Sequence, residues 1–237
     1  AYYNVGLDHQ GAGEPALARA TYEEALRLDA HYVPALNNLA ILKHAEGETE
    51  SAVELFLQVL EIEPEHGGAR MGLAGALLVQ ERPREALAHY LELRKTTPND
   101  VRVYRGLALS HLKLGQTEKA TAWSEKAQKG SDPYAALLLK AFVLEHNASG
   151  DRYGSGYDES TAQETYRGII TRYPDRPQAY YNLGIIHARA SRWPDAVAKF
   201  DHALSVDSTY VDARTALDEV ERVMKLQNTQ LLRVKRP

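Results

Sequence analysis

Three of the nine histidines, His9, His111 and His187, stand at matching places in a pattern that recurs along the chain. Imidazole nitrogens in a cluster could hold a metal ion or move protons in catalysis. Successive copies of a pattern place equivalent side chains one copy apart, whereas the ligands of one zinc ion lie within roughly 2.1 Å of it. We therefore interpret these rings as polar groups that pack between helices, and we expect no metal site.

The other residue types that could do chemistry also argue against a catalytic site. The chain has no cysteine, which removes disulfides, thiolate zinc sites and cysteine nucleophiles. Metalloprotease, phosphate-loop, serine-hydrolase and dinucleotide-binding motifs do not occur in it. Acidic residues are spread among basic ones, as solvated helices require. We expect no catalytic residue, no cofactor and no enzyme activity.

Composition excludes two classes of partner. The 237 residues are 44% hydrophobic and 25% charged, which is ordinary for a soluble protein. A formal net charge of -4 lacks the basic excess that binds nucleic acid. The longest apolar run, about residues 135–144, contains Lys140 and is too short for a membrane-spanning helix. The first residue is not Met, so we expect a piece of a longer chain. The sequence leaves the compartment open, with the cytoplasm favoured slightly over the periplasm or secretion.

The elements that position these residues recur along the chain. The segment Tyr2 to His9 returns almost unchanged as Tyr180 to His187. One alanine recurs with a step of 34 residues, except for a single step of 42: Ala18, Ala52, Ala86, Ala120, Ala162 and Ala196. A large aromatic residue follows four places later in all copies but the fourth, which has Ser124: Tyr22, Phe56, Tyr90, Tyr166 and Phe200. The columns predict six copies and one insertion of eight residues.

Each copy has the pattern of two helices joined by a turn. Val5 and Gly6 begin a column of large-then-small pairs that lets two helices approach closely. A turn-forming residue follows in most copies, at Gly13, Gly47, Gly115 and Ser191, whereas the third copy has Glu81. The second helix then carries the alanine and the aromatic residue on one stripe, and proline or aspartate ends it. No segment alternates with the period of a strand.

Helix pairs of 34 residues with this pattern resemble the tetratricopeptide repeat family. The resemblance implies an all-α, right-handed superhelix (α-solenoid) whose first helices line a concave groove. We expect six repeats, a capping helix at 211–231 with Val211, Leu217, Val220 and Met224 on its apolar stripe, and a basic tail at 232–237. The expected repeats are 1–32, 33–66, 67–100, 101–134, 135–176 with the insertion, and 177–210. The register of the first helix in the fifth repeat stays open.

The groove is the candidate binding site. Side chains on the first helices that face away from the large-then-small column are mostly apolar or small, and Arg102 and Arg105 share one face. The candidate residues are Tyr3, Asn4, Leu7, Asn37, Asn38, Ile41, Met71, Gly72, Gly75, Arg102, Arg105, Gly106, Leu109, Tyr181, Asn182 and Ile185. Such a floor suits a protein or peptide partner with apolar anchors and an acidic group. The alternative is that these residues pack against the next repeat or the tail.

Two known uses of the family do not match this sequence. The clamp that binds chaperone tails would need Lys, Asn, Asn, Lys and Arg at five places that here hold Tyr3, Leu7, Asn38, Gly68 and Gly72. The asparagine ladder of the glycosyltransferase branch is also incomplete, because glycines interrupt it.

The insertion falls in a polar segment, residues 146–160. Added loop length costs little free energy, so we interpret it as slack that tolerates deletion, with a partner site as the alternative.

The predicted function is a non-enzymatic scaffold for protein-protein interaction. The alternatives are a regulatory or substrate-recruiting repeat region of a larger enzyme, and a scaffold that associates with itself.

Overall fold

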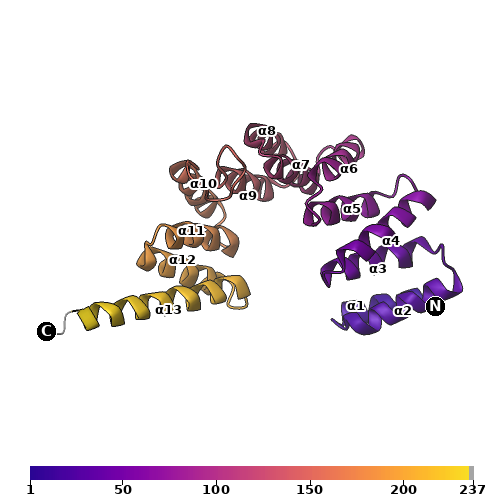
Figure 1. Cartoon of the computed structure of the whole chain (residues 1–237), viewed down its shortest axis with the longest axis horizontal. Helices are drawn as coiled ribbons and strands as arrows, with labels where there is room; N and C mark the ends of the chain where they lie inside the picture. The colour runs from indigo at the N-terminus through magenta and orange to yellow at the C-terminus, as the bar shows by residue number, and fades with distance from the viewer. Residues whose placement is uncertain (235–237) are drawn as a thin grey trace. The chain divides into compact units, whose positions relative to one another are not determined.

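The computed structural model describes the backbone of residues 1–234 and the side chains of residues 1–227. Within these residues the chain forms thirteen α-helices and no strand, only an isolated bridge between His146 and Arg152 (Figure 1). The helices are α1 Tyr2–Gly11, α2 Pro15–Leu28, α3 Val33–Ala45, α4 Thr49–Ile62, α5 Gly67–Val79, α6 Pro83–Thr96, α7 Val101–Lys113, α8 Thr117–Ala127, α9 Pro133–Leu144, α10 Glu159–Arg172, α11 Pro177–Arg189, α12 Trp193–Val206 and α13 Val211–Val234. The all-α repeat architecture expected from the sequence is confirmed. No helix in the described part of the chain combines the length and the apolarity needed to cross a membrane.

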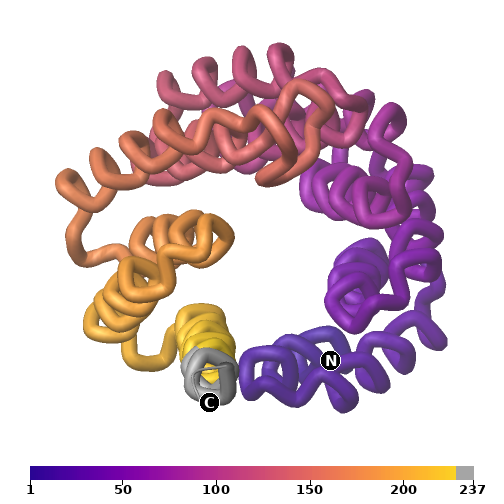
Figure 2. Tube along the Cα trace, turned by 60° about the vertical axis from the view of Figure 1, so that its left-hand side comes forward, coloured from indigo at the N-terminus to yellow at the C-terminus, as the bar shows by residue number. Residues whose placement is uncertain are grey.

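The chain divides into two compact units. Unit 1 is Ala1–Ser131 and holds the pairs α1/α2 to α7/α8; unit 2 starts at Asp132 and holds α9/α10, α11/α12 and α13. Five of the six repeat ranges expected from the sequence contain a whole helix pair; the fifth pair begins two residues before its expected range, because α9 starts at Pro133. In unit 1, which runs from indigo to magenta in Figure 2, the tube shows the helices in two rows. The second helices α2, α4 and α6 each pack on their own first helix and on the first helix of the following pair, and α8 packs on α7.

The recurring alanine and aromatic columns form the core. All six alanines of the column are fully buried, and so are the aromatic residues apart from Tyr90, which is 5% exposed. In the fourth repeat Ser124 is buried in place of the ring, and its hydroxyl donates to the carbonyl of Thr121. Small residues on the first helices make room for these rings. A β-carbon on Gly184 of α11, for example, would lie 2.5 Å from the Phe200 ring. The sequence columns are therefore packing positions.

The turns inside the pairs share a backbone conformation. Gly13, Gly47 and Gly115 have φ values of 74°, 86° and 67°. Glu81 and Ser191 stand at the same place with φ of 56°, although left-handed backbone costs residues with a β-carbon free energy. The turn is thus kept in the third repeat, where its glycine is missing.

The structure corrects the expected capping helix in two respects. α13 packs on α12 and α11, with Leu217 and Val220 buried as expected. Val211, expected on the same stripe, is 71% exposed, because Ala213 instead lies against the core. The helix continues past residue 231 to Val234, and so takes in the first part of the expected tail. The rest of that tail, 235–237, lies outside the described residues.

Candidate partner-binding surfaces

Each first helix of unit 1 presents one stripe of residues that are exposed or half-buried. The stripes adjoin, because α3 packs on α5 and α5 on α7. They are Pro34, Asn37, Ile41 and Ala45 on α3, Gly68, Met71, Gly75 and Val79 on α5, and Arg102, Arg105, Leu109 and Lys113 on α7. We call these residues, with Tyr3, Asn4 and Leu7 of α1, the inner surface of unit 1. Leu7, Ile41 and Val79 expose 41%, 43% and 62% of their area, so apolar side chains are available to a partner.

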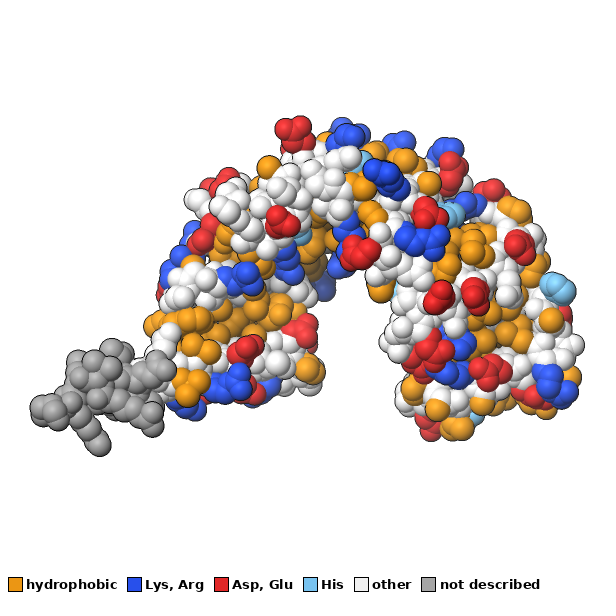
Figure 3. Space-filling view, in the orientation of Figure 1, with side chains coloured by type: hydrophobic (Ala, Val, Ile, Leu, Met, Phe, Trp, Pro, Cys, Tyr) orange, Lys and Arg blue, Asp and Glu red, His pale blue; other side chains and the backbone are white. Residues whose placement is uncertain are grey.

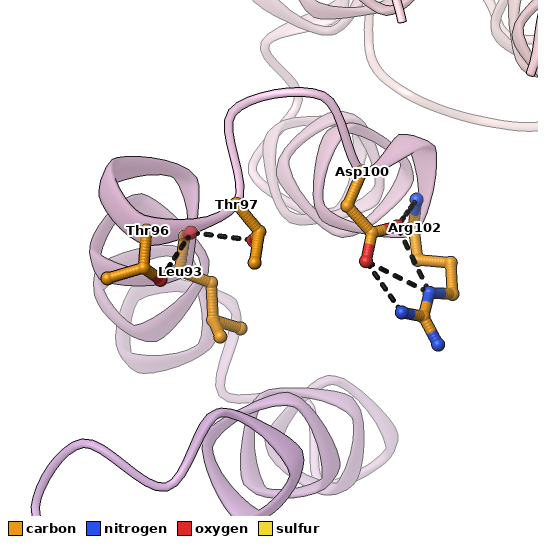
Figure 4. A network of polar contacts seen from close by, with 5 residues as sticks. All are labelled: Leu93, Thr96, Thr97, Asp100 and Arg102. Carbon is orange, nitrogen blue, oxygen red and sulfur yellow. Dashed lines mark hydrogen bonds and ion pairs between the residues drawn. The ribbon is translucent and has the colours of Figure 1, made fainter. Parts of the chain in front are cut away.

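The two arginines on α7 differ in their partners. Arg102 folds back on its own helix, where its Nε and one Nη group donate to Asp100, with the Nη contact at 2.6 Å (Figure 4). Asp100 also caps α7 by accepting from the backbone N–H of Arg102, and these donors hold the pKa of its carboxyl below the ordinary value. Thr96 and Thr97, drawn beside it, donate to the carbonyl of Leu93 at the end of α6. Both arginines are exposed on α7, as the sequence predicts, but the charge of Arg102 is paired with Asp100, which leaves Arg105 as the unpaired cation.

Arg105 is exposed and forms no hydrogen bond or ion pair with any residue whose side chain the structure describes. It lies close enough to Tyr90 to oppose the rise that burial causes in the pKa of that phenol. The Tyr90 hydroxyl reaches the inner surface, 3.9 Å from where a β-carbon on Gly75 would stand, and it too has no hydrogen-bond partner among the described residues. Sequence reasoning missed Tyr90, because its column reads as core.

In two other repeats the tyrosine at this place, Tyr22 or Tyr166, has a hydroxyl that is hydrogen-bonded. Tyr22 donates to Oε1 of Gln10 at 2.8 Å and accepts from Nδ2 of Asn38 at 3.5 Å. Asn38 also donates to the hydroxyl of Tyr3, at 3.4 Å. Leu78 and Gly106 occupy the corresponding places around Tyr90, and neither side chain can form a hydrogen bond. This explains why Tyr90 lacks the partners that Tyr22 has, and it assigns Asn38 a structural contact as well as a place on the inner surface.

Two candidate glycines are packing positions. A β-carbon on Gly72 would overlap the Phe56 ring, and one on Gly106 would overlap the Tyr90 ring. Gly106 is also buried. The expectation that these glycines lie open on the groove floor is corrected, because the aromatic residue of the preceding repeat fills the space above each of them.

The three candidates in unit 2 are partly covered by the chain itself. The ring of Tyr181 meets Tyr210 edge-on at 5.5 Å, and Nδ2 of Asn182 donates to the Tyr166 hydroxyl at 3.2 Å. Ile185 is half-buried against the cluster that contains Phe200. Unit 2 therefore does not repeat the open apolar stripes of unit 1.

The insertion is anchored, so its interpretation as slack is wrong. Glu145, just after α9, is fully buried; its Oε1 accepts from the Tyr166 hydroxyl at 2.7 Å and its Oε2 from Nε of Arg152 at 2.7 Å. Burial raises the pKa of the Glu145 carboxyl, against the opposing effect of Arg152. Tyr153, with φ of 56°, packs on the core of unit 2, and its backbone N–H donates to the Glu145 carbonyl. No signal in the sequence marked Glu145 as buried, because the register of α9 was open.

The histidine column has a local role. Nδ1 of His9 lies 2.7 Å from Oε2 of Glu14, and Nδ1 of His111 lies 2.9 Å from Oε1 of Gln116. At the third site Nε of Arg192 donates to Nδ1 of His187 at 3.0 Å. In each case the ring contacts the residue five places later, across the turn. Among the described residues no group of three or more His, Cys, Asp or Glu side chains is placed to hold a metal ion.

Models of the tetratricopeptide repeat match residues 3–66 and 160–210 in one case and 43–109 in another. The chain belongs to the tetratricopeptide repeat family. A solved tetratricopeptide repeat protein from Parabacteroides merdae is similar over 93% of this chain and 83% of its own, with a TM-score of 0.77 at 18% identity. At that identity the likeness shows the fold alone, and the family fold is a scaffold for protein-protein interaction.

Curated relatives are similar over part of their length. Human protein O-mannosyl-transferase TMTC1 is 26% identical over 225 residues, which cover 94% of this chain and 25% of that protein. Human tetratricopeptide repeat protein 6 is 28% identical over 76% of this chain and 32% of its own length. The photosystem I assembly protein Ycf3 of Synechococcus sp. (strain CC9605) is 39% identical over 66 residues, which cover 27% of this chain and 38% of that protein. The chain thus spans about a quarter to two fifths of these relatives.

Proposed function

We propose that this chain is a non-enzymatic scaffold whose unit 1 binds a peptide or helical segment of a partner protein on its inner surface. The observation that carries the proposal is the pair of unbonded polar groups, Arg105 and the Tyr90 hydroxyl, beside exposed apolar side chains. A guanidinium and a hydroxyl donate together to one carboxylate. The partner is therefore a segment with apolar anchors over α3 and α5 and an acidic residue over α7.

The chemistry of the stripes supports this order. No acidic residue occurs on the stripes of α3, α5 and α7. Lys113, the remaining cation, is bound to Glu81 at 2.6 Å, which leaves Arg105 to attract an acid. Apolar contacts supply most of the affinity, and the charged contact sets the register of the segment.

A peptide array read with the intact protein supplies the ligand, and calorimetry of the bound peptide with variants tests the surface. Ile41→Asp and Arg105→Glu should each weaken binding by more than about tenfold, because one removes an anchor and the other reverses a charge in a partly dry site. Leu57→Asp is the matched control, because Leu57 is 45% exposed, a fraction similar to the 43% of Ile41, but lies on the second helix α4. Loss of binding in the Leu57 variant, with Ile41→Asp unaffected, would place the site elsewhere.

A second candidate function is a substrate-recruiting repeat region of a larger enzyme. The likeness to O-mannosyl-transferase TMTC1, of which the chain spans 25%, favours it. The complete reading frame decides: a transferase domain beside these repeats would support it, and its absence would leave the independent scaffold.

A further inference from the structure

We propose that unit 2 carries a second docking surface, separate from the inner surface of unit 1, which binds an acidic segment of a partner protein through Arg189 and Arg152. The two guanidinium groups share one aromatic ring. Cζ of Arg189 lies 4.6 Å and Cζ of Arg152 4.9 Å from the ring centroid of Tyr153. The insertion thereby brings a second arginine beside the end of α11. We call Arg152, Tyr153 and Arg189 the loop surface.

Both arginines have donors to offer. A guanidinium that stacks on a ring keeps its N–H groups free at its edge, where a carboxylate binds with two parallel hydrogen bonds. Arg189 is exposed and has no hydrogen bond or ion pair with the described side chains. Arg152, whose side chain is 43% exposed, uses Nε and one Nη group for Glu145, and the same Nη group donates to the Tyr153 hydroxyl, so its other Nη group is the one it can offer.

Three of the acidic residues around the loop are engaged within the chain, whereas Asp151 in the loop is exposed. Glu145 is bound to Arg152, and Glu159 forms an ion pair with Arg192. Asp158 caps α10 by accepting from the N–H and hydroxyl of Thr161. Arg189 forms no ion pair with the described side chains, and charge complementarity favours an acidic ligand for it.

The surface is held in place before any partner arrives. Oδ1 of Asn147 accepts from the backbone N–H groups of Ser149 and Asp151 at 3.0 and 2.9 Å, which closes the start of the loop. The ring of Tyr157 meets that of Tyr153 edge-on at 5.6 Å, and its hydroxyl donates to Glu159. A preorganised site loses less conformational entropy on binding, and arginine with tyrosine is the composition typical of strong contact points.

The wider surroundings fit the same ligand. Figure 3 shows Lys and Arg side chains among hydrophobic ones, with Asp and Glu side chains between them, in the part of the view where Figure 1 labels α9, α10 and α11. Aspartate and glutamate side chains in an extended segment would reach the arginines while its backbone crosses the tyrosines. We therefore name an acidic peptide, rather than a nucleic acid or a membrane, as the ligand.

The test uses fluorescence anisotropy of a labelled hexaglutamate peptide with the intact chain at about 150 mM salt. Arg189→Glu should weaken binding at least about tenfold, and Arg189→Lys less, because lysine keeps the charge but loses the planar fork. Arg172→Glu is the matched control: its guanidinium also stacks on a tyrosine, Tyr173, at 5.4 Å, but on the second helix α10. That variant should bind as the parent does, and circular dichroism checks that every variant is folded.

Three outcomes would overturn the proposal. One is that the parent chain does not bind the peptide, and another is that Arg172→Glu weakens binding as much as Arg189→Glu. The third is that inorganic phosphate alone displaces the peptide at low millimolar concentration, which would show a small-anion site instead. Arg105→Glu separates the two surfaces: loss of hexaglutamate binding there, with Arg189→Glu intact, would assign the peptide to unit 1.

Discussion

Tyr22 in unit 1 and Tyr166 in unit 2 occupy the same place in their repeats and make the same two hydrogen bonds. Each donates to a residue at the end of its own first helix and accepts from an asparagine of the next repeat. The difference is the acceptor, which is the neutral amide of Gln10 in unit 1 and the carboxyl of Glu145 in unit 2. A buried carboxylate needs a cation, whereas a buried amide does not.

This difference accounts for the structure of the insertion. Arg152 comes from the loop that follows Glu145, and it supplies the charge that the carboxylate needs. The loop is then fixed, and its Tyr153 lies beneath Arg189. In the first repeat the amide needs no such partner, and the turn there is short. The tyrosine's acceptor is an amide in unit 1, where the surface is apolar and open. It is a carboxyl in unit 2, where the loop surface is rich in arginine and tyrosine.

The largest expected effect comes from removing the loop. Deleting residues 148–157 should destabilise unit 2 by about 3–5 kcal/mol, because Glu145 would stay buried without Arg152. Urea unfolding followed by the fluorescence of Trp193, in a Trp123→Phe background, reports on unit 2, since each unit holds one of the two tryptophans.

The control is the same deletion combined with Glu145→Gln, which should regain part of the lost stability, as Gln10 shows that an amide serves Tyr22. A deletion that costs less than about 1 kcal/mol would restore the interpretation of the loop as slack.

A smaller loss of stability is expected at Tyr90, where Gly106 stands in place of the asparagine that bonds Tyr22 and Tyr166. Gly106→Ala should cost about 1–3 kcal/mol, because a β-carbon there overlaps the Tyr90 ring. Gly168→Ala in α10 is the control; nothing lies within 4 Å of its β-carbon position, so alanine should stabilise by about 0.5–1 kcal/mol. Thermal unfolding midpoints that move in the same direction would contradict the packing role of Gly106.

The fold was predictable from the sequence because packing repeats. A column of alanines and rings is visible at a fixed step, and the six alanines are buried as that column requires. The details of the surface were not predictable, since they depend on side-chain direction. Arg102 turns back to Asp100, and Tyr90 extends its hydroxyl to the inner surface. A column of residue types does not carry that information.

The insertion was misjudged for a related reason. Its polar composition is that of a flexible loop, and the buried acid that anchors it, Glu145, directly follows α9, the one helix whose register the sequence left open. The burial of Glu145 could not be inferred, because nearly all other acidic residues in the described part of the chain are exposed or half-buried.

Unit 2 should also respond to pH through Glu145. Its folded-state pKa is raised, chiefly by burial, so in the window above the ordinary value the unfolded chain binds fewer protons than the folded one. The contribution of Glu145 to the stability of unit 2 should therefore fall as pH rises from about 4.5 through the raised pKa. Burial lowers the pKa of His146 and His187 in the same unit, so these two groups act in the opposite direction, and only the difference between the parent and a Glu145 variant isolates the carboxyl. Tyr153 and Tyr166 do not titrate in this window, because burial raises the pKa of both phenols. Urea midpoints read from Trp193 should lose this slope in Glu145→Gln, and an unchanged slope would assign it to another group.

The smallest effect compares the two asparagines at the far end of these contacts. Asn182→Ala should cost about 0.5–1.5 kcal/mol, the usual net value of one hydrogen bond, because Nδ2 stands 3.2 Å from the Tyr166 hydroxyl. Asn38→Ala should cost less, since its bonds to Tyr3 and Tyr22 measure 3.4 and 3.5 Å, near the limit for a hydrogen bond. Double-mutant cycles with Tyr166→Phe and Tyr22→Phe isolate each pair. A larger coupling for Asn38 than for Asn182 would show that the longer contact in unit 1, and not the shorter one in unit 2, joins its repeats more tightly.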